Sequence, residues 1–200
     1  MVRRRLVPLA LALALGALGM ACSATDGRNL PPPDPARTTT TPSAPVIQTE
    51  PGDAFTLSSP SFVDGQTIPV DFTCQGTGPS PDLAWTGAPS DAAELALVVR
   101  DRSADGFLHW VVAGIDPTVT GFGRDGLPEG AVEAGNGAGS AGWLPPCPPT
   151  GSGVHFYELT LHALPGTLAI LPGADGSTTA DLIEQASMAE TTLTVTYSGG

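Results

Sequence analysis

Apolar residues after position 55 come in short runs separated by glycine, proline and aspartate, which is typical of β-strands joined by turns. Five such runs predict strands, at Thr67–Cys74, Glu94–Asp101, His109–Ile115, Val154–Leu164 and Thr191–Tyr197. Because no helices alternate with these runs, we expect antiparallel sheets rather than a parallel βαβ sheet. The pattern therefore predicts a mainly β fold of two packed antiparallel sheets with a few short helices.

One of these helices is predicted near the C-terminus. Thr178–Asp181 resembles a capping box in which aspartate replaces glutamate. The small and apolar residues that follow it at helical spacing are Leu182, Ile183, Ala186 and Ala189, which predicts one buried face.

Alternation along the strands predicts where their ionisable side chains point, because residues two apart share a face of a sheet. His155 and Tyr157 precede Leu159 and Leu161 on one face of their strand. Asp101 ends the row formed by Leu95, Leu97 and Val99, and His109 opens its own strand. Three strands thus carry an ionisable group at one end of an apolar row. If these ends meet, they form the mouth of a pocket.

The first 22 residues predict export. Arg3–Arg5 form a basic start, Leu6–Leu18 an apolar stretch, and small residues follow at Gly19 and Ala21. The stretch is too short for a good membrane-spanning helix. Cys22 directly follows it and resembles the acylated cysteine of bacterial lipoproteins, although Gly19 stands where that motif has leucine. We therefore expect a lipoprotein of the cell membrane, with ordinary cleavage and secretion as the alternative.

Residues 23–51 are rich in proline and threonine and carry few large apolar side chains, so we expect a disordered tether between the signal segment and a domain at 52–200. The whole chain has a formal net charge of −12 and no lysine. Such an acidic chain repels phosphate backbones, which excludes general nucleic-acid binding.

The sequence does not support other motifs that would indicate cofactor binding or catalysis. Gly137–Gly142 matches the letters of a dinucleotide-binding loop but neither follows a predicted strand nor opens a helix. The chain lacks a Gly-x-Ser-x-Gly nucleophile elbow, so an enzyme is not expected. His109, His155 and Asp101 include no closely spaced pair of metal ligands, so neither a metal nor another cofactor is expected.

Several short motifs, in order along the chain, resemble the phosphatidylethanolamine-binding protein family in its bacterial Raf-kinase-inhibitor-like branch. They are Ser59–Phe62, Ile68-Pro69, Thr73–Gly76, Ser80–Trp85 with Gly87 and Pro89, His109–Val112, Leu127–Gly130 with Gly135-Asn136, and Cys147–Gly151 followed by His155 and Tyr157. The last group is the most specific. The resemblance implies a sandwich of two antiparallel sheets and a small anion pocket lined by Asp101, His109, Cys147, Pro148, Pro149, His155 and Tyr157.

The chain departs from the family pattern at two places. Where the family has Asp-Pro-Asp-Ala-Pro, this chain has Asp101-Arg102-Ser103-Ala104-Asp105, without either proline. Phe156 stands where the family has arginine.

The three cysteines suggest a further hypothesis. If Cys22 carries lipid, then export, cysteine parity and the family motif positions of Cys74 and Cys147 together favour a disulfide between the latter two.

The function implied is that of an exported, membrane-anchored protein that binds a phosphorylated small molecule or a phospholipid head group. A regulatory role through an unknown protein partner is a variant of it. A structural lipoprotein without a working pocket, and a hydrolase with His109 or His155 as general base, are the alternatives.

Overall fold

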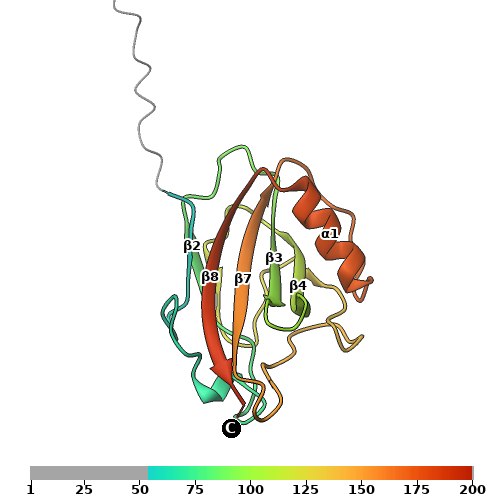
Figure 1. Cartoon of the computed structure of the whole chain (residues 1–200). Helices are drawn as coiled ribbons and strands as arrows, with labels where there is room; N and C mark the ends of the chain where they lie inside the picture. The colour runs from blue at the N-terminus through green and yellow to red at the C-terminus, as the bar shows by residue number, and fades with distance from the viewer. Residues whose placement is uncertain (1–53, 200) are drawn as a thin grey trace, which may run out of the picture. The chain divides into compact units, whose positions relative to one another are not determined.

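The computed structural model describes residues 54–199. The predicted signal segment, the predicted acylation site Cys22 and the proline-rich tether lie outside these residues. Ten elements follow one another along the described chain, numbered as in Figure 1. They are β1 Thr56–Ser58, the 3-10 helix Val70–Phe72, β2 Leu83–Thr86, β3 Glu94–Asp101, β4 Phe107–Ile115, β5 Gly121–Phe122, β6 Val132–Glu133, β7 Val154–Leu164, α1 Gly176–Ala186 and β8 Ala189–Ser198.

The strands form two antiparallel sheets, as the apolar pattern predicted. The larger sheet has the order β6-β4-β3-β7-β8, and the smaller one the order β1-β2-β5. In the larger sheet β3 is central, and Asp101 at its end pairs with Phe107 of β4 and Tyr157 of β7. The ends of three neighbouring strands are thereby brought to one edge.

Two hydrophobic cores lie on opposite faces of the larger sheet. Leu97, Val99 and Leu159 face the smaller sheet and pack in a cluster with Trp85 of β2. Ala96 and Val98, on the other face, pack in a second cluster with Ile183 of α1. The larger sheet is thus the middle of three layers, with β2 and α1 on its two sides (Figure 1). Because β3 is buried on both faces, its position relative to β4 and β7 is closely fixed.

Four of the five predicted strands are confirmed. Glu94–Asp101 and Val154–Leu164 are β3 and β7, while β4 and β8 contain the other two. The strand predicted at Thr67–Cys74 is wrong, because a 3-10 helix occupies Val70–Phe72 and Thr67 makes one isolated bridge to β8. Pro69 lacks an N–H to donate to a neighbouring strand, which opposes a regular ladder there.

The predicted C-terminal helix exists, but it begins earlier than predicted. Asp175 is its N-cap residue and its carboxylate accepts the N–H of Thr178 at 2.8 Å, so Thr178 is not the cap. Ile183 is buried as expected, but Leu182 is exposed and Ala189 already belongs to β8. None of the helices in residues 54–199 is long and apolar enough to cross a membrane.

Candidate pocket at the ends of β3, β4 and β7

A cavity of about 260 Å³ opens where β3 ends and β4 and β7 begin. The loop that precedes β7 forms its other wall. Its lining is Asp101, Ala104, Phe107, His109, Leu144, Pro145, Cys147, Pro148, Pro149, His155 and Tyr157. All seven residues that the sequence assigned to a ligand pocket are therefore brought together in one cavity. That they bind a ligand remains a prediction.

Asp101 is the centre of the hydrogen bonds around this cavity. Its side chain is 5% exposed, and its Oδ2 accepts a hydrogen bond from Nδ1 of His155 at 2.6 Å. Its Oδ1 accepts the backbone N–H of Ser103 at 2.8 Å, and its charge acts on the nearby Tyr157 hydroxyl. Asp101 therefore orients the His155 ring rather than standing open to a ligand.

The loop after Asp101 is held by hydrogen bonds where the family has prolines. The N–H of Arg102 donates to the carbonyl of Phe156 at 2.8 Å, and the N–H of Phe156 donates to the Ser103 hydroxyl at 3.1 Å. The N–H of Gly106 closes the loop by donating to the carbonyl of Asp101 at 3.0 Å. The loop is thus fixed to the start of β7 although both prolines are absent.

His109 also lines the cavity, and its ring is fixed in two ways. Its Nδ1 donates to the carbonyl of Leu144 at 2.7 Å, and its ring packs edge-on against Tyr157 with 5.1 Å between centroids. Among the described residues, no hydrogen bond uses its Nε2, so this nitrogen is the one that can meet a ligand. Burial lowers the pKa of His109, although its bond to Leu144 and the Asp101 charge oppose this shift.

The lowered pKa predicts how stability changes with pH. Below about pH 6.5, His109 is protonated in the unfolded chain but less so in the folded chain, where its pKa is lower. The free energy of unfolding should therefore fall as pH drops from 7.5 to 5.5, with His109 contributing at most about 1.4 kcal/mol per pH unit. Urea denaturation should give a weaker pH dependence for His109→Gln than for the wild type.

His162 serves as the comparison in this experiment. Burial also lowers its pKa, so His162→Gln should weaken the pH dependence with the same sign. Identical slopes for the wild type and both variants would show that neither histidine is held neutral by the fold.

The hydroxyl of Tyr157 stays protonated over the whole physiological range. Burial, and then the charge and hydrogen bond of Asp101, raise the pKa of Tyr157 far above its ordinary value. Tyr157 is therefore a neutral hydrogen-bonding group at the base of the cavity. Among residues 54–199, no three histidine, cysteine or acidic side chains lie close enough to hold a metal ion.

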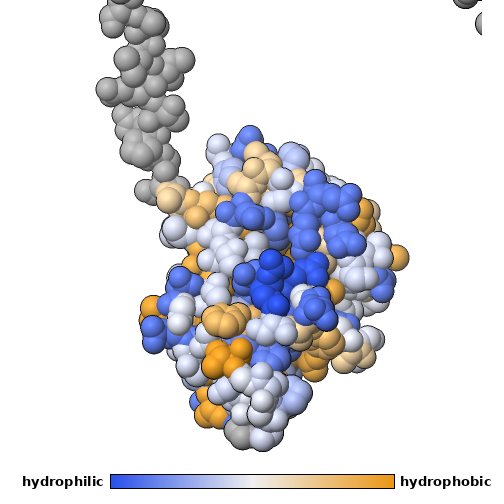
Figure 2. Space-filling view, viewed as in Figure 1, coloured by the Kyte–Doolittle hydropathy of each residue, from blue (hydrophilic) through white to orange (hydrophobic). Residues whose placement is uncertain are grey.

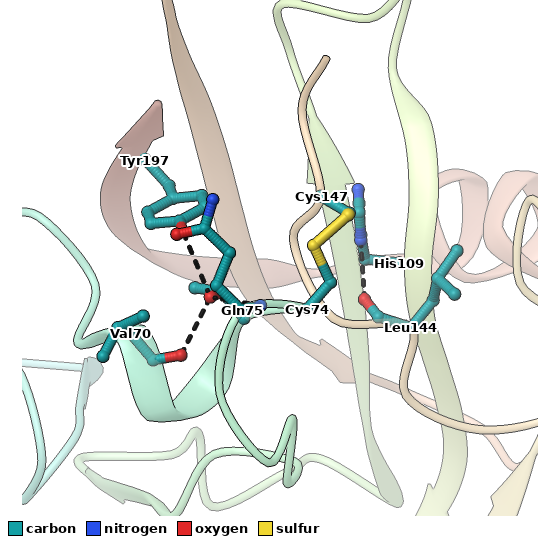
Figure 3. Close-up of a disulfide and its surroundings, with 8 residues drawn as sticks. Val70, Cys74, Gln75, His109, Leu144, Cys147 and Tyr197 are labelled. Atoms are coloured by element: carbon teal, nitrogen blue, oxygen red, sulfur yellow. Dashed lines mark hydrogen bonds between the residues drawn. A yellow bond between two sulfur atoms is a disulfide. The ribbon is translucent and has the colours of Figure 1, made fainter. Parts of the chain in front are cut away.

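The disulfide expected between Cys74 and Cys147 is present, and it joins residues 73 positions apart. Figure 3 shows it beside His109 and Leu144. The N–H of Cys74 also donates to the carbonyl of Pro146 at 3.1 Å. Cys147 and Pro148 belong to the cavity wall, so the disulfide attaches this wall to the segment after the 3-10 helix.

One residue at the cavity rim, Ser152, was not predicted from the sequence. Its hydroxyl lies 2.9 Å from Nε2 of His155 and 2.7 Å from the carbonyl oxygen of Pro149. Its position three residues before His155, between Gly151 and Gly153, was the available signal. Ser152 is not part of a Gly-x-Ser-x-Gly motif, because Thr150 and Val154 stand at the two glycine positions.

A larger groove of about 620 Å³ crosses the other face of the sheet, between α1 and strands β3, β7 and β8. Figure 2 shows a strongly hydrophilic surface over β7 and toward α1. Both of its arginines are paired, Arg100 with Glu184 at 2.9 Å and Arg102 with Glu158 at 3.1 Å. Asp105 and Glu190 also line the groove, so its acidic side chains outnumber its arginines and oppose the binding of an anion. We therefore place the candidate site in the smaller cavity.

The comparison with protein families agrees with this geometry. Residues 58–198 match the family described as phosphatidylethanolamine-binding protein. That match covers all the strands of the larger sheet and every residue lining the cavity. The chain therefore belongs to the phosphatidylethanolamine-binding protein family.

Individual relatives extend the comparison. The chain is 42% identical over 194 residues to the protein named "Putative lipoprotein LppC" of Mycobacterium tuberculosis, covering 96% of this chain and 93% of LppC. It is 37% identical over 153 residues to a UPF0098 protein of Methanothermobacter thermautotrophicus, covering 72% of this chain and 99% of that protein.

Two solved structures are also similar. E. coli YbcL, described as a new member of the mammalian PEBP family, superposes with a TM-score of 0.70 at 28% identity, covering 73% of this chain and 99% of YbcL. The homologue CT736 of Chlamydia trachomatis gives a TM-score of 0.66 at 30% identity, with 74% of this chain and 99% of CT736 covered. These similarities confirm the predicted fold.

Proposed function

We propose that this chain is an exported, lipid-anchored binding protein whose cavity holds the phosphoryl group of a small ligand or a phospholipid head group. The observation that carries the proposal is the meeting of His109, His155 and Tyr157 with Asp101 in one cavity of about 260 Å³. Few polar groups in a mainly apolar cavity are typical of a site that fixes one small charged group.

His109 supplies the main interaction in this proposal. Its Nδ1 is already bonded to the Leu144 carbonyl, so a proton taken up at Nε2 turns it into a cation that donates to a phosphate oxygen. Burial keeps the His109 ring neutral at pH 7 in the empty site, and a bound anion favours the protonated ring. Ligand and proton therefore bind together, in surroundings where such a charged hydrogen bond is strong.

This coupling gives the test of the proposal. Inorganic phosphate and phosphoethanolamine, titrated into the purified protein by calorimetry, should bind more tightly as pH falls from 8 to 6, by up to about tenfold per pH unit for one proton taken up. His109→Ala should remove both the binding and its pH dependence. Ser140→Ala, at an exposed serine outside the cavity, should bind as the wild type does.

The two ligands separate the possible sources of the phosphoryl group. Similar affinities for both would mean that the phosphoryl group alone is recognised, whereas tighter phosphoethanolamine binding would indicate a head group. No heat with either ligand from correctly folded protein would contradict the proposal and favour a structural lipoprotein.

The lipid anchor is supported by the sequence of the N-terminus and by LppC, whose name describes a lipoprotein and whose similarity extends over 96% of this chain. In a bacterial host fed an alkyne-labelled fatty acid, the wild type should incorporate label and fractionate with membranes. Cys22→Ser should lose the label. Unlabelled wild-type protein in the medium would instead indicate ordinary cleavage and secretion.

A further inference from the structure

Asp101, His155 and Ser152 form a continuous chain of hydrogen bonds at the rim of the cavity. Nδ1 of His155 donates to the Asp101 carboxylate at 2.6 Å, and Nε2 of the same ring lies 2.9 Å from the Ser152 hydroxyl. Asp101 and His155 are buried, whereas Ser152 is exposed. A hydroxyl next to a base that is itself oriented by a carboxylate is the arrangement of a serine nucleophile.

The bond to Asp101 determines which nitrogen of His155 can act as a base. With its Nδ1 proton held by Asp101, the neutral ring carries its lone pair on Nε2, toward Ser152. The Ser152 hydroxyl has one proton and two acceptors within reach, this nitrogen and the Pro149 carbonyl at 2.7 Å. Rotation of the hydroxyl toward His155 places its proton where a general base removes it.

The loop leaves this hydroxyl open to a reactant. The flanking residues Gly151 and Gly153 have no side chains, and both adopt positive φ angles, of 81° and 90°. The N–H of Ser152 donates to the Pro149 carbonyl at 3.0 Å, which fixes the turn. Ser152 is thus a rigidly placed and accessible serine beside a buried His–Asp pair.

We propose that Ser152 is a nucleophile activated by His155 and Asp101, and that the protein hydrolyses short-chain carboxylic esters. The Ser152 oxygen forms a bond to the ester carbonyl carbon while its proton moves to Nε2 of His155. The carbon–oxygen bond to the alcohol then breaks, and His155 returns the proton to the departing alcohol. Water, deprotonated by His155, next attacks the acyl-serine and releases the carboxylic acid and free Ser152.

The cavity beside Ser152 points to the kind of ester. Its walls include Phe107, Leu144 and Pro148, and its volume is about 260 Å³. Apolar walls around a cavity of this size suit a short aliphatic acyl group. Pro149 and His155 both line the cavity and contact Ser152, so the reacting carbonyl would lie at the rim with its acyl chain inside.

The test is covalent labelling of the purified protein with diisopropyl fluorophosphate, in which the serine oxygen displaces fluoride from phosphorus. Mass spectrometry should find one adduct, on Ser152, in the native protein. Ser152→Ala should carry none, and its exposed position leaves the fold intact by circular dichroism. Ser140→Ala, which removes another exposed serine, should be labelled as fast as the wild type.

The same reaction tests the role of His155. His155→Gln should slow the labelling by about a hundredfold or more, which is the contribution expected of a general base. Wild-type protein unfolded in urea provides the same comparison if that variant fails to fold, because only the native arrangement activates the serine. With p-nitrophenyl butyrate, release of p-nitrophenol by the wild type should depend on Ser152 in the same way.

Three results would overturn the inference: no adduct on Ser152 in native protein, equal labelling of native and unfolded protein, or ester hydrolysis unchanged in Ser152→Ala. The outcome is independent of the phosphoryl-binding proposal. Protein that binds phosphate without being labelled would exclude the reactive serine alone. Protein that is labelled on Ser152 but gives no heat with phosphate would contradict the binding proposal alone.

Discussion

Asp101→Ala is expected to abolish phosphate binding and to lower the free energy of unfolding by about 3–5 kcal/mol, because buried hydrogen-bond donors lose their acceptor at a cost of about 1–3 kcal/mol each. The substitution removes the acceptor of two donors at once, Nδ1 of His155 and the N–H of Ser103. Each buried donor left without a partner is costly. Urea denaturation and calorimetry with inorganic phosphate measure the two effects.

Two further variants separate the charge of Asp101 from its shape. Asp101→Asn keeps the side-chain volume and one accepting oxygen, so this variant should lose less stability than Asp101→Ala. The His155 ring is then no longer held by a carboxylate. Asp105→Asn changes an exposed carboxylate in the same loop, at a positive φ that asparagine tolerates. It should change neither the free energy of unfolding nor the affinity for phosphate. An Asp101→Ala protein as stable as the Asp105→Asn protein would contradict the central place of Asp101.

Loss of the Cys74–Cys147 disulfide is the second large effect. The bond joins residues 73 positions apart, and removal of a loop constraint of this length should cost about 4 kcal/mol. A domain of this size commonly has a total stability of about 5–15 kcal/mol, so the cost is a large share. Urea denaturation of Cys74→Ser/Cys147→Ser, compared with the oxidised wild type, measures it.

The same variant should also bind phosphate more weakly. Cys147 and Pro148 line the cavity, and the disulfide is the covalent attachment of that wall to Cys74. Reduced wild-type protein is the matched control, because it has the same missing bond without any substitution. A loss of less than about 1 kcal/mol, with unchanged phosphate affinity, would mean that packing alone holds the wall.

The apolar pattern predicted the middle of the fold better than its edges. β3 and β7 were predicted to the residue because long apolar rows are bounded by turn-forming residues there. β5 and β6 have two residues each, and strands this short carry no detectable alternation. The strand predicted at Thr67–Cys74 failed for a different reason, since Ile68 and Phe72 are buried but lie in a turn-like segment. Burial alone does not distinguish a strand from a 3-10 turn.

The candidate pocket was predictable because its polar residues end apolar rows. Alternation placed Asp101 and Tyr157 at the ends of apolar rows, and His109 was predicted only to open its strand. Antiparallel pairing of β3 with β4 and β7 brings all three to one edge, with a register shift in the β3–β4 pairing at His109. Ser152 lies in a loop, where no periodicity shows which way a side chain points. Its proximity to His155 depends on the turn made by Pro149, Gly151 and Gly153, which becomes evident in the folded chain.

Phosphoryl binding in the cavity is tested most directly by the imidazole signals of the protein in long-range ¹H–¹⁵N NMR spectra. The chain has three histidines, His109 and His155 at the cavity and His162 on the opposite face of the larger sheet. On addition of inorganic phosphate at pH 7, the His109 ring nitrogens should move to the values of a protonated ring while those of His162 stay unchanged. Unmoved His109 signals at saturating phosphate, or equal shifts at His162, would contradict phosphoryl binding at this site.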